Sequence, residues 1–292
     1  MKNLKQNIMP CIALAFLLPL AGCGEELSVS PVAEGTPLTI MAEIGTSSSA
    51  VTRAEVVPNL YDRSAFVAGD QINVVCSRNG VQLASSGYTL NSAATAWQVA
   101  SGSSGLGFLP AIVCRASFPI AYEGISADQQ AADGSAFLKS NYLLTPQIPV
   151  SGAEVNFTGD NAFGHENAKL ALKFLGSGGA SLPAFSRITL QATGLRTGGG
   201  ASETILPFRP AANEYTWCAV IYPRNQATDI TVSVTDANNV TYTAKISCGM
   251  QKASSYTYTL QLRNDILVPV GAAEIEDWAL SVRHNGSFDS AN

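Results

Sequence analysis

Apolar and polar residues alternate along much of the chain, which is the pattern of β-strands that bury one face. Three clear examples are residues 167–175, 229–235 and 255–262. In the first of them, the apolar positions on one face are Ala168, Leu170, Leu172 and Phe174. Residues 125–132 alone favour a short helix. The pattern therefore predicts an all-β protein.

Turn-forming residues separate these strands at short intervals. The dipeptide Asn79-Gly80 stands between two apolar runs and is typical of a two-residue hairpin turn. Residues 236–239 likewise connect the strand at 229–235 to one at 240–247. Stretches rich in glycine and serine predict loops at 101–107, 176–181 and 197–202. Many short strands joined by turns favour β-sandwiches over βαβ units.

A short repeat indicates that the chain holds two related domains. Cys114 and Cys218 are each followed, at the same spacing, by an aromatic residue and a proline. A length of 292 residues also suits about two domains. We predict an N-terminal β-sandwich at 55–153 and a C-terminal β-sandwich with a tail at 154–292, separated where prolines and a Ser-Gly pair interrupt the strand pattern.

The N-terminus has the layout of an export signal. Lys2 and Lys5 precede an apolar run at 8–20, which is shorter than the roughly 20 residues of a membrane-spanning helix. The run ends in Leu-Ala-Gly-Cys23, which resembles the bacterial lipobox. We therefore predict a signal peptide at 1–22 and acylation of Cys23, whose two or three acyl chains would anchor an outer-membrane lipoprotein stably at the cell surface. The alternative is an ordinary secretory signal with an incidental cysteine.

Composition narrows the range of functions. The chain has 17 basic and 22 acidic residues, and a net charge of −5 disfavours a nucleic-acid partner. It has two histidines, no Gly-x-Ser-x-Gly elbow, and no phosphate-loop lysine after the glycines at 198–200. The acidic residues Glu274, Glu276 and Asp277 fit a solvated strand edge as well as a catalytic pair. We expect a protein that is not an enzyme and that has no cofactor and no metal site.

The cysteines suit an oxidising compartment. Once Cys11 leaves with the signal peptide and Cys23 is acylated, four remain: Cys76, Cys114, Cys218 and Cys248. Four cysteines allow three pairings. Because two fall in each half of the chain, disulfides Cys76–Cys114 and Cys218–Cys248 are the natural pairing. Four buried free thiols are the alternative, since cysteine is among the most buried residue types.

Several short motifs occur together in a characteristic order. They are Cys23 at the lipobox, Val51-Thr52-Arg53-Ala54, Phe66-Val67-Ala68-Gly69-Asp70-Gln71-Ile72, Phe163-Gly164-His165-Glu166-Asn167-Ala168-Lys169-Leu170, Tyr222-Pro223, Tyr256-Thr257-Tyr258-Thr259-Leu260 and Ile275-Glu276-Asp277-Trp278. The ordered set resembles the fimbrillin-like (Mfa-like) lipoproteins. The resemblance implies a pilus subunit of two tandem transthyretin-like β-sandwich domains after a lipoprotein signal peptide. In such pili an Arg-specific protease removes the first strand, and the strand of a neighbouring subunit fills the groove that is left.

Residues 23–54 are compatible with this mechanism. Leu38, Ile40, Ala42 and Ile44 fall on one face of a predicted strand at 36–44. A small, polar stretch follows, and Arg53 is the first basic residue after Cys23. A cut between Arg53 and Ala54 would release the strand together with the lipid. The alternative is that Arg53 is a surface arginine that no protease cuts.

The C-terminus leaves the position in a pilus open. Residues 279–292 are rich in serine, asparagine and glycine and would make a poor donor strand, so an anchor or tip role, or a donor strand from 266–282, is open. Ser290 lies in an Asp-Ser-Ala sequence that resembles a bacterial O-glycosylation acceptor. We expect a structural or adhesive subunit that pairs with other pilus subunits or itself. The alternative is a monomeric surface lipoprotein that binds glycans or host proteins through Trp97, Trp217 or Tyr222.

Overall fold

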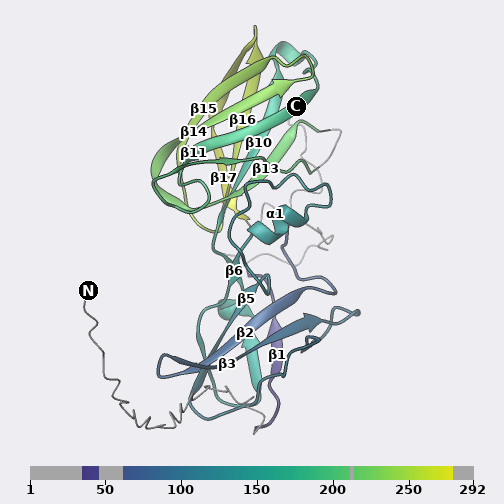
Figure 1. Cartoon of the computed structure of the whole chain (residues 1–292), viewed down its shortest axis with the longest axis vertical. Coiled ribbons are helices and arrows are strands. Elements are labelled where there is room, and N and C mark those ends of the chain that lie inside the picture. The colour runs from purple at the N-terminus through teal and green to yellow at the C-terminus, as the bar shows by residue number, and fades with distance from the viewer. Residues whose placement is uncertain (1–34, 46–61, 211–213, 279–292) are drawn as a thin grey trace, which may run out of the picture. The chain divides into compact units, whose positions relative to one another are not determined.

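The computed structural model of the protein describes residues 35–45, 62–210 and 214–278, the side chain of Cys248 excepted. The predicted signal peptide at 1–22 lies outside the described residues, and so do Cys23, Arg53, Ala54 and Ser290. Within these ranges, no helix has the length and hydrophobicity needed to cross a membrane. Strands dominate the described chain, which confirms the all-β prediction and its tandem β-sandwiches (Figure 1).

The first β-sandwich is built around the N-terminal strands. Its strands are β1 (Thr39–Ala42), β2 (Gln71–Arg78), β3 (Val81–Leu90), β4 (Trp97–Val99), β5 (Ile112–Phe118), β6 (Leu143–Leu144), β7 (Ile148–Val150), β8 (Glu154–Phe157) and β9 (Gly164–His165). The main sheet has the order β4-β3-β2-β5-β6-β9, and β7 pairs with β5. Strand β1 pairs with β8 in a separate sheet, and side chains from both sheets share one core.

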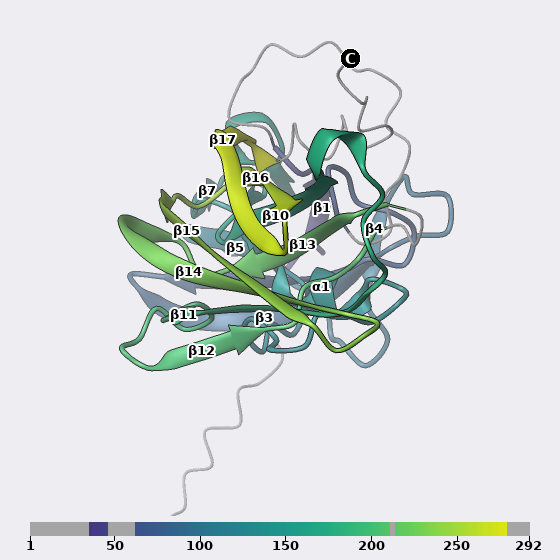
Figure 2. The ribbon, with the colours of Figure 1, turned by 90° about the horizontal axis from the view of Figure 1, so that it is seen from above.

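The second β-sandwich follows in sequence. Its strands are β10 (Ala168–Gly176), β11 (Phe185–Thr193), β12 (Ser202–Ile205), β13 (Thr216–Ile221), β14 (Arg224–Asp236), β15 (Thr241–Met250), β16 (Ser254–Arg263) and β17 (Ile266–Asp277). One sheet has the order β13-β10-β16-β17 and the other β12-β11-β14-β15. Figure 2 shows β11, β12 and β14 side by side. Buried side chains of both sheets form a second core.

Several local predictions are confirmed. Strands β10, β14 and β16 lie where the alternation predicts them. Asn79 and Gly80 have φ angles of 51° and 79° and join β2 to β3, as expected for a tight hairpin turn with two left-handed residues. Short-range sequence signals therefore suffice for these elements.

The predicted helix at 125–132 is wrong. The α-helix of the described chain is α1 (Ser135–Ser140), and short 3₁₀ turns lie at Gly159–Asn161 and Ser177–Gly179. Asp128 instead bridges to Leu206. The fully buried amide of Gln129 accepts from the N–H of Val220 and donates to its carbonyl, both at 2.9 Å. These long-range bonds hold the segment extended because they satisfy the amide inside the core, where local helix propensity counts for little.

Packing mixes the two halves of the sequence. The first core continues through Val155, Phe157 and Phe163. The second core includes Ile125 and Phe137, which precede β6 in the chain. The predicted division between 153 and 154 remains a prediction, because each core takes side chains from both sides of it.

The cysteines differ in their pairing. Cys76 and Cys114 are directly opposite each other on β2 and β5, and a disulfide joins them across a Cα–Cα distance of 4.3 Å. Cys218 is buried and free, so the predicted Cys218–Cys248 disulfide is wrong. Cys218 lies on β13 of one sheet, and position 248 lies on β15 of the other sheet. In the described structure Cys218 packs in the second core instead, among apolar side chains of both sheets.

Candidate functional site: the first strand and its groove

Strand β1 packs one face into the first core, as its alternation predicts. Leu38, Ile40 and Ile44 are buried, with exposed fractions of 6%, 3% and 6%, and Ala42 is half-buried against the same core. Met41, on the opposite face, is 39% exposed. The strand is thus short and has one apolar, buried face and one exposed face.

Main-chain hydrogen bonds hold β1 along its length and at both of its ends. It runs parallel to β8, with Thr39 opposite Glu154 and Ala42 opposite Phe157. At its start the N–H of Leu38 donates to the carbonyl of Leu106 at 2.8 Å. Beyond its end the N–H of Gly45 donates to the carbonyl of Phe163 at 3.0 Å, and the N–H of Phe163 donates to the carbonyl of Glu43 at 2.9 Å. Neighbouring backbone thus fixes the strand by a continuous ladder.

Removal of β1 would open an apolar groove. The groove's walls include Val155 and Phe157 on β8 and Phe163, all of which belong to the same buried core. Phe163 packs edge-on against Phe66, with ring centroids 5.1 Å apart. Burial of Leu38, Ile40 and Ile44, in β1 and directly beside it, is worth on the order of 5–9 kcal/mol. An emptied groove would therefore have a strong tendency to accept another apolar strand.

A buried polar cluster begins directly after the segment that contains Arg53. The Lys169 ammonium donates to Oδ2 of Asp62 at 2.6 Å, and the indole Nε1 of Trp278 donates to Oδ1 at 2.7 Å. The Asp62 and Lys169 side chains are 3% and 2% exposed. The ring of His165 stacks on Trp278, with centroids 4.3 Å apart. Arg63, the next residue, forms a buried ion pair with Asp70 at 2.9 Å. The partners Lys169, Trp278 and Asp70 of this cluster all lie outside β1.

The polar cluster joins motifs that are far apart in the sequence. His165 and Lys169 come from one motif of the ordered set, Asp70 from another and Trp278 from the last. Sequence reasoning singled out these motifs but did not place them together, and it missed Asp62 and Arg63. Two adjacent charged residues ordinarily indicate a solvated loop, so no local signal could have shown their burial.

Burial also governs the titration of two groups near the cluster. Burial lowers the pKa of His165 to about 4. The negative charges of Asp62 and Asp277 oppose this shift, and the positive charge of Lys169 adds to it. The neutral ring places Nδ1 3.0 Å from Oδ1 of Asn141, to which it donates. Burial raises the pKa of the Cys218 thiol to about 12, so this cysteine is an inert core residue.

The three aromatic residues that were considered as a binding platform lie in different environments and do not form one exposed surface. Trp217 is 5% exposed and lies in the second core. Trp97 is half-buried and packs against Phe66, with ring centroids 5.1 Å apart. Tyr222 is the exposed member, at 43%. Among the described residues, no group of three or more His, Cys, Asp or Glu side chains could hold a metal ion.

Comparisons with known proteins agree with this architecture. The chain resembles the crystal structure of a candidate cell adhesion protein from Bacteroides ovatus ATCC 8483 (19% identity, 84% of this chain and 98% of that chain, TM-score 0.62). It also resembles one from Bacteroides uniformis ATCC 8492 (12% identity, 85% and 99%, TM-score 0.58). At these identities the likeness concerns the fold. No curated protein has a matching sequence.

The sequence itself carries the family relationship. Residues 127–278, just over half of the chain, match the fimbrillin-like family. The matched region begins in the extended segment that contains Gln129 and ends at Trp278, the indole of which reaches Asp62. By this match the chain belongs to the fimbrillin-like family.

Proposed function

We propose that this protein is a structural and adhesive subunit of a cell-surface pilus, exported as a lipoprotein and assembled by β-strand addition. Fimbrillin-like proteins are non-enzymatic structural or binding proteins of the cell surface, and that much follows from membership. The finer proposal rests on one observation: β1 buries an apolar face in a groove while the chain after position 61 is anchored separately.

The position of β1 in the chain supports removal by proteolysis. Cys23 precedes it and Arg53 follows it, so a single cut after Arg53 would separate strand and lipid from the body. The body would keep its fold, because Asp62 and Arg63 hold the new N-terminal region through buried ion pairs. The groove would then be open to a strand from another subunit, which would restore both main-chain hydrogen bonds and apolar burial.

Strand β17 has the properties of a donor strand. It is the edge strand of its sheet and pairs with β16. Ile266 and Ile275 are each 62% exposed and Val270 is 37% exposed, whereas Leu267, at 4%, is buried in the second core. Ile266, Val268 and Val270 repeat at the two-residue spacing with which the apolar residues of β1 fill the groove. We infer that a donor drawn from the first part of 266–282, with Trp278 kept on Asp62, enters the groove of a second copy or of another pilus subunit.

N-terminal sequencing and intact mass of protein recovered from the cell surface test this proposal. Wild type is expected to start at Ala54 and to form oligomers that survive mild detergent. Arg53→Ala is expected to retain acylated Cys23 and to stay monomeric. Arg187→Ala, which changes an exposed arginine on β11, is the matched control and should behave as wild type. An acylated, whole wild-type monomer would overturn the proposal and leave the monomeric surface lipoprotein as the better reading.

A further inference from the structure

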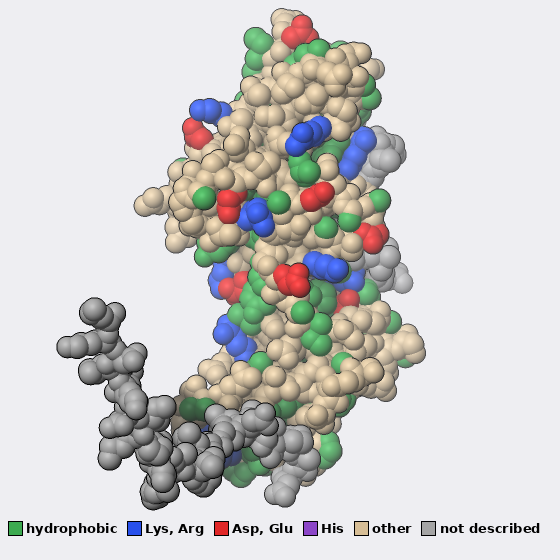
Figure 3. Space-filling model, viewed as in Figure 1, with side chains coloured by type: hydrophobic (Ala, Val, Ile, Leu, Met, Phe, Trp, Pro, Cys, Tyr) green, Lys and Arg blue, Asp and Glu red, His purple; other side chains and the backbone are tan. Residues whose placement is uncertain are grey.

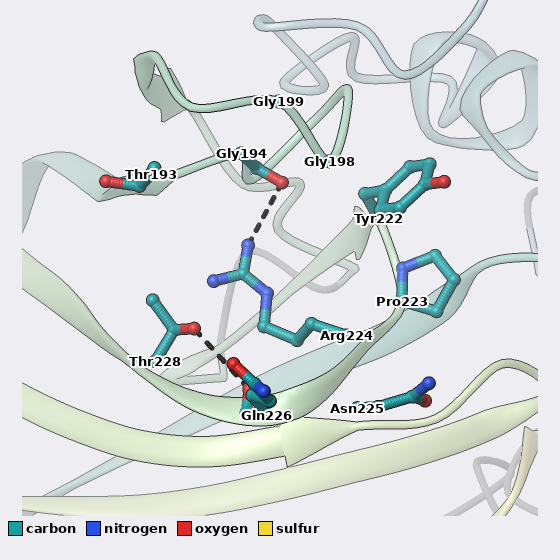
Figure 4. A pocket seen from close by; sticks show the side chains of 10 residues that line it. All are labelled: Thr193, Gly194, Gly198, Gly199, Tyr222, Pro223, Arg224, Asn225, Gln226 and Thr228. Carbon is teal, nitrogen blue, oxygen red and sulfur yellow. Dashed lines mark hydrogen bonds between the residues drawn. The ribbon is translucent and has the colours of Figure 1, made fainter.

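Tyr222 and Pro223 form a ridge between two hollows on the surface of the second β-sandwich. The first hollow has a volume of about 500 Å³ and is lined by Gly194, Gly198 and residues 224–226, among others (Figure 4). The second, of about 530 Å³, is lined by Gln251 and Lys252. Both hollows share Tyr222, Pro223 and Asn225 as walls. Each is within the size range of sites for small ligands.

The Tyr222 ring is held in place from one side. Its backbone N–H donates to the carbonyl of Leu195 at 2.9 Å. The ring lies so close to Gly198 that a Cβ there would be 2.4 Å from Cε1 of the ring. Gly198 also has a φ of +70°, which favours glycine. The backbone of Gly198 therefore contacts one side of the Tyr222 ring, while 43% of Tyr222 stays exposed.

The polar groups around the ring match hydroxyl chemistry. Asn225 and Gln226 are exposed, and each amide both donates and accepts hydrogen bonds, as a sugar hydroxyl does. Arg224 braces the wall through a hydrogen bond from its guanidinium to the carbonyl of Gly194 at 3.2 Å (Figure 4). Of the described residues that line the hollows, none carries a carboxylate. Lys252, which pairs with Glu166 at 2.9 Å, adds a cation beside the second hollow.

We propose that this ridge is a carbohydrate-binding site in which one sugar ring stacks on Tyr222 and its neighbours occupy the two hollows. An aromatic face covers the apolar C–H face of a sugar, and the amides bond its hydroxyl edge. The absence of lining carboxylates, together with Arg224 and Lys252, allows acidic as well as neutral sugars. This site does not depend on pilus assembly, since neither β1 nor β17 contributes to its lining.

Binding of the full-length, detergent-solubilised lipoprotein to an array of neutral and uronic-acid oligosaccharides tests the site. The strongest array ligand is then titrated by calorimetry. Tyr222→Ala should weaken binding at least tenfold, and Asn225→Ala should weaken it as well. Tyr222→Phe keeps the ring and should retain binding. Val240→Ala, at a residue 46% exposed in the turn between β14 and β15, is the matched control and should bind as wild type.

Two results would overturn the site: no oligosaccharide binds, or Tyr222→Ala binds as tightly as wild type with an unchanged melting temperature. Lys252→Ala should weaken acidic ligands more than neutral ones. The Arg53→Ala variant should bind sugar as wild type does. Its binding therefore separates a failure of the carbohydrate site from a failure of strand-exchange assembly.

Discussion

Asp62 holds two distant parts of the chain with one carboxylate. Lys169 is 107 residues away in the sequence and Trp278 is 216 away, yet both donate to it. Removal of one member of a buried ion pair leaves the other charge in a poorly solvated place, which costs more than the pair itself contributes. This cluster is therefore where a single substitution should damage the fold most.

Asp62→Ala is expected to lower the free energy of unfolding by about 3–5 kcal/mol, because it removes the carboxylate that pairs with the buried ammonium of Lys169. Asp229→Ala is the matched control. Its carboxylate lies 3.9 Å from the ammonium of Lys245, with both side chains largely exposed, so its loss should cost under about 1 kcal/mol. Urea denaturation measures both. Similar losses of free energy of unfolding in the two variants would show that the buried cluster stabilises the fold no more than an exposed ion pair does.

His165 should make stability depend on pH. Because burial lowers its pKa from 6.5 to about 4, the unfolded chain binds a proton between these values that the folded chain does not. The free energy of unfolding should thus be highest above pH 6.5 and fall towards pH 4, by up to about 1.4 kcal/mol per pH unit from this group. His165→Gln removes the titration and should flatten the slope. Identical slopes, measured by urea denaturation across this range, would contradict the assignment.

At the scale of elements, the disulfide and the edge strands matter most. Cys76–Cys114 connects β2 and β5, adjacent strands of the main sheet, and closes a separation of 38 residues. A covalent link across such a loop chiefly restricts the unfolded chain. In contrast, β1 and β17 lack comparable links to their neighbours, and β17 pairs with β16 at the edge of its sheet. The described chain thus combines two central strands that a disulfide joins with two strands, β1 and β17, that no disulfide joins to their neighbours.

Replacement of both Cys76 and Cys114 by alanine should lower the free energy of unfolding by about 2–4 kcal/mol. Reduction of the wild-type disulfide by dithiothreitol should give a similar loss. Cys218→Ala is the control: it removes a free, buried thiol and should cost only about 1 kcal/mol. Urea denaturation compares the three. A double variant no less stable than Cys218→Ala would show that the link contributes nothing.

The elements that local sequence predicts are those that local interactions decide. The alternation in β10 and the Asn79-Gly80 turn suffice because each needs only its neighbours. The extended course of Gln129 depends on Val220, and the burial of Asp62 depends on Lys169, both far along the chain. The free state of Cys218 was likewise not visible locally, since the sheet order that places it and position 248 on different sheets is a long-range property. Long-range partners carry no signal in a single sequence.

At the scale of the whole molecule, the chain carries few charges. Charged residues make up 13% of the chain. Figure 3 shows basic and acidic side chains interspersed rather than gathered on the visible face. Large fields of one sign would steer charged partners over long distances. Recognition by this protein is therefore expected to rest on shape, backbone hydrogen bonds and apolar contact at short range.

The groove that β1 fills beside β8 has a consequence for any assembly that reuses it. A replacement strand gives one subunit as donor and the next as acceptor, so the contact is head-to-tail, and it builds an open fibre wherever the rotation between subunits does not close a ring. A fibre built from it has two chemically distinct ends, one with a vacant groove and one with an unused strand. Growth then has a direction, and a subunit that lacks either part terminates the fibre at a defined end.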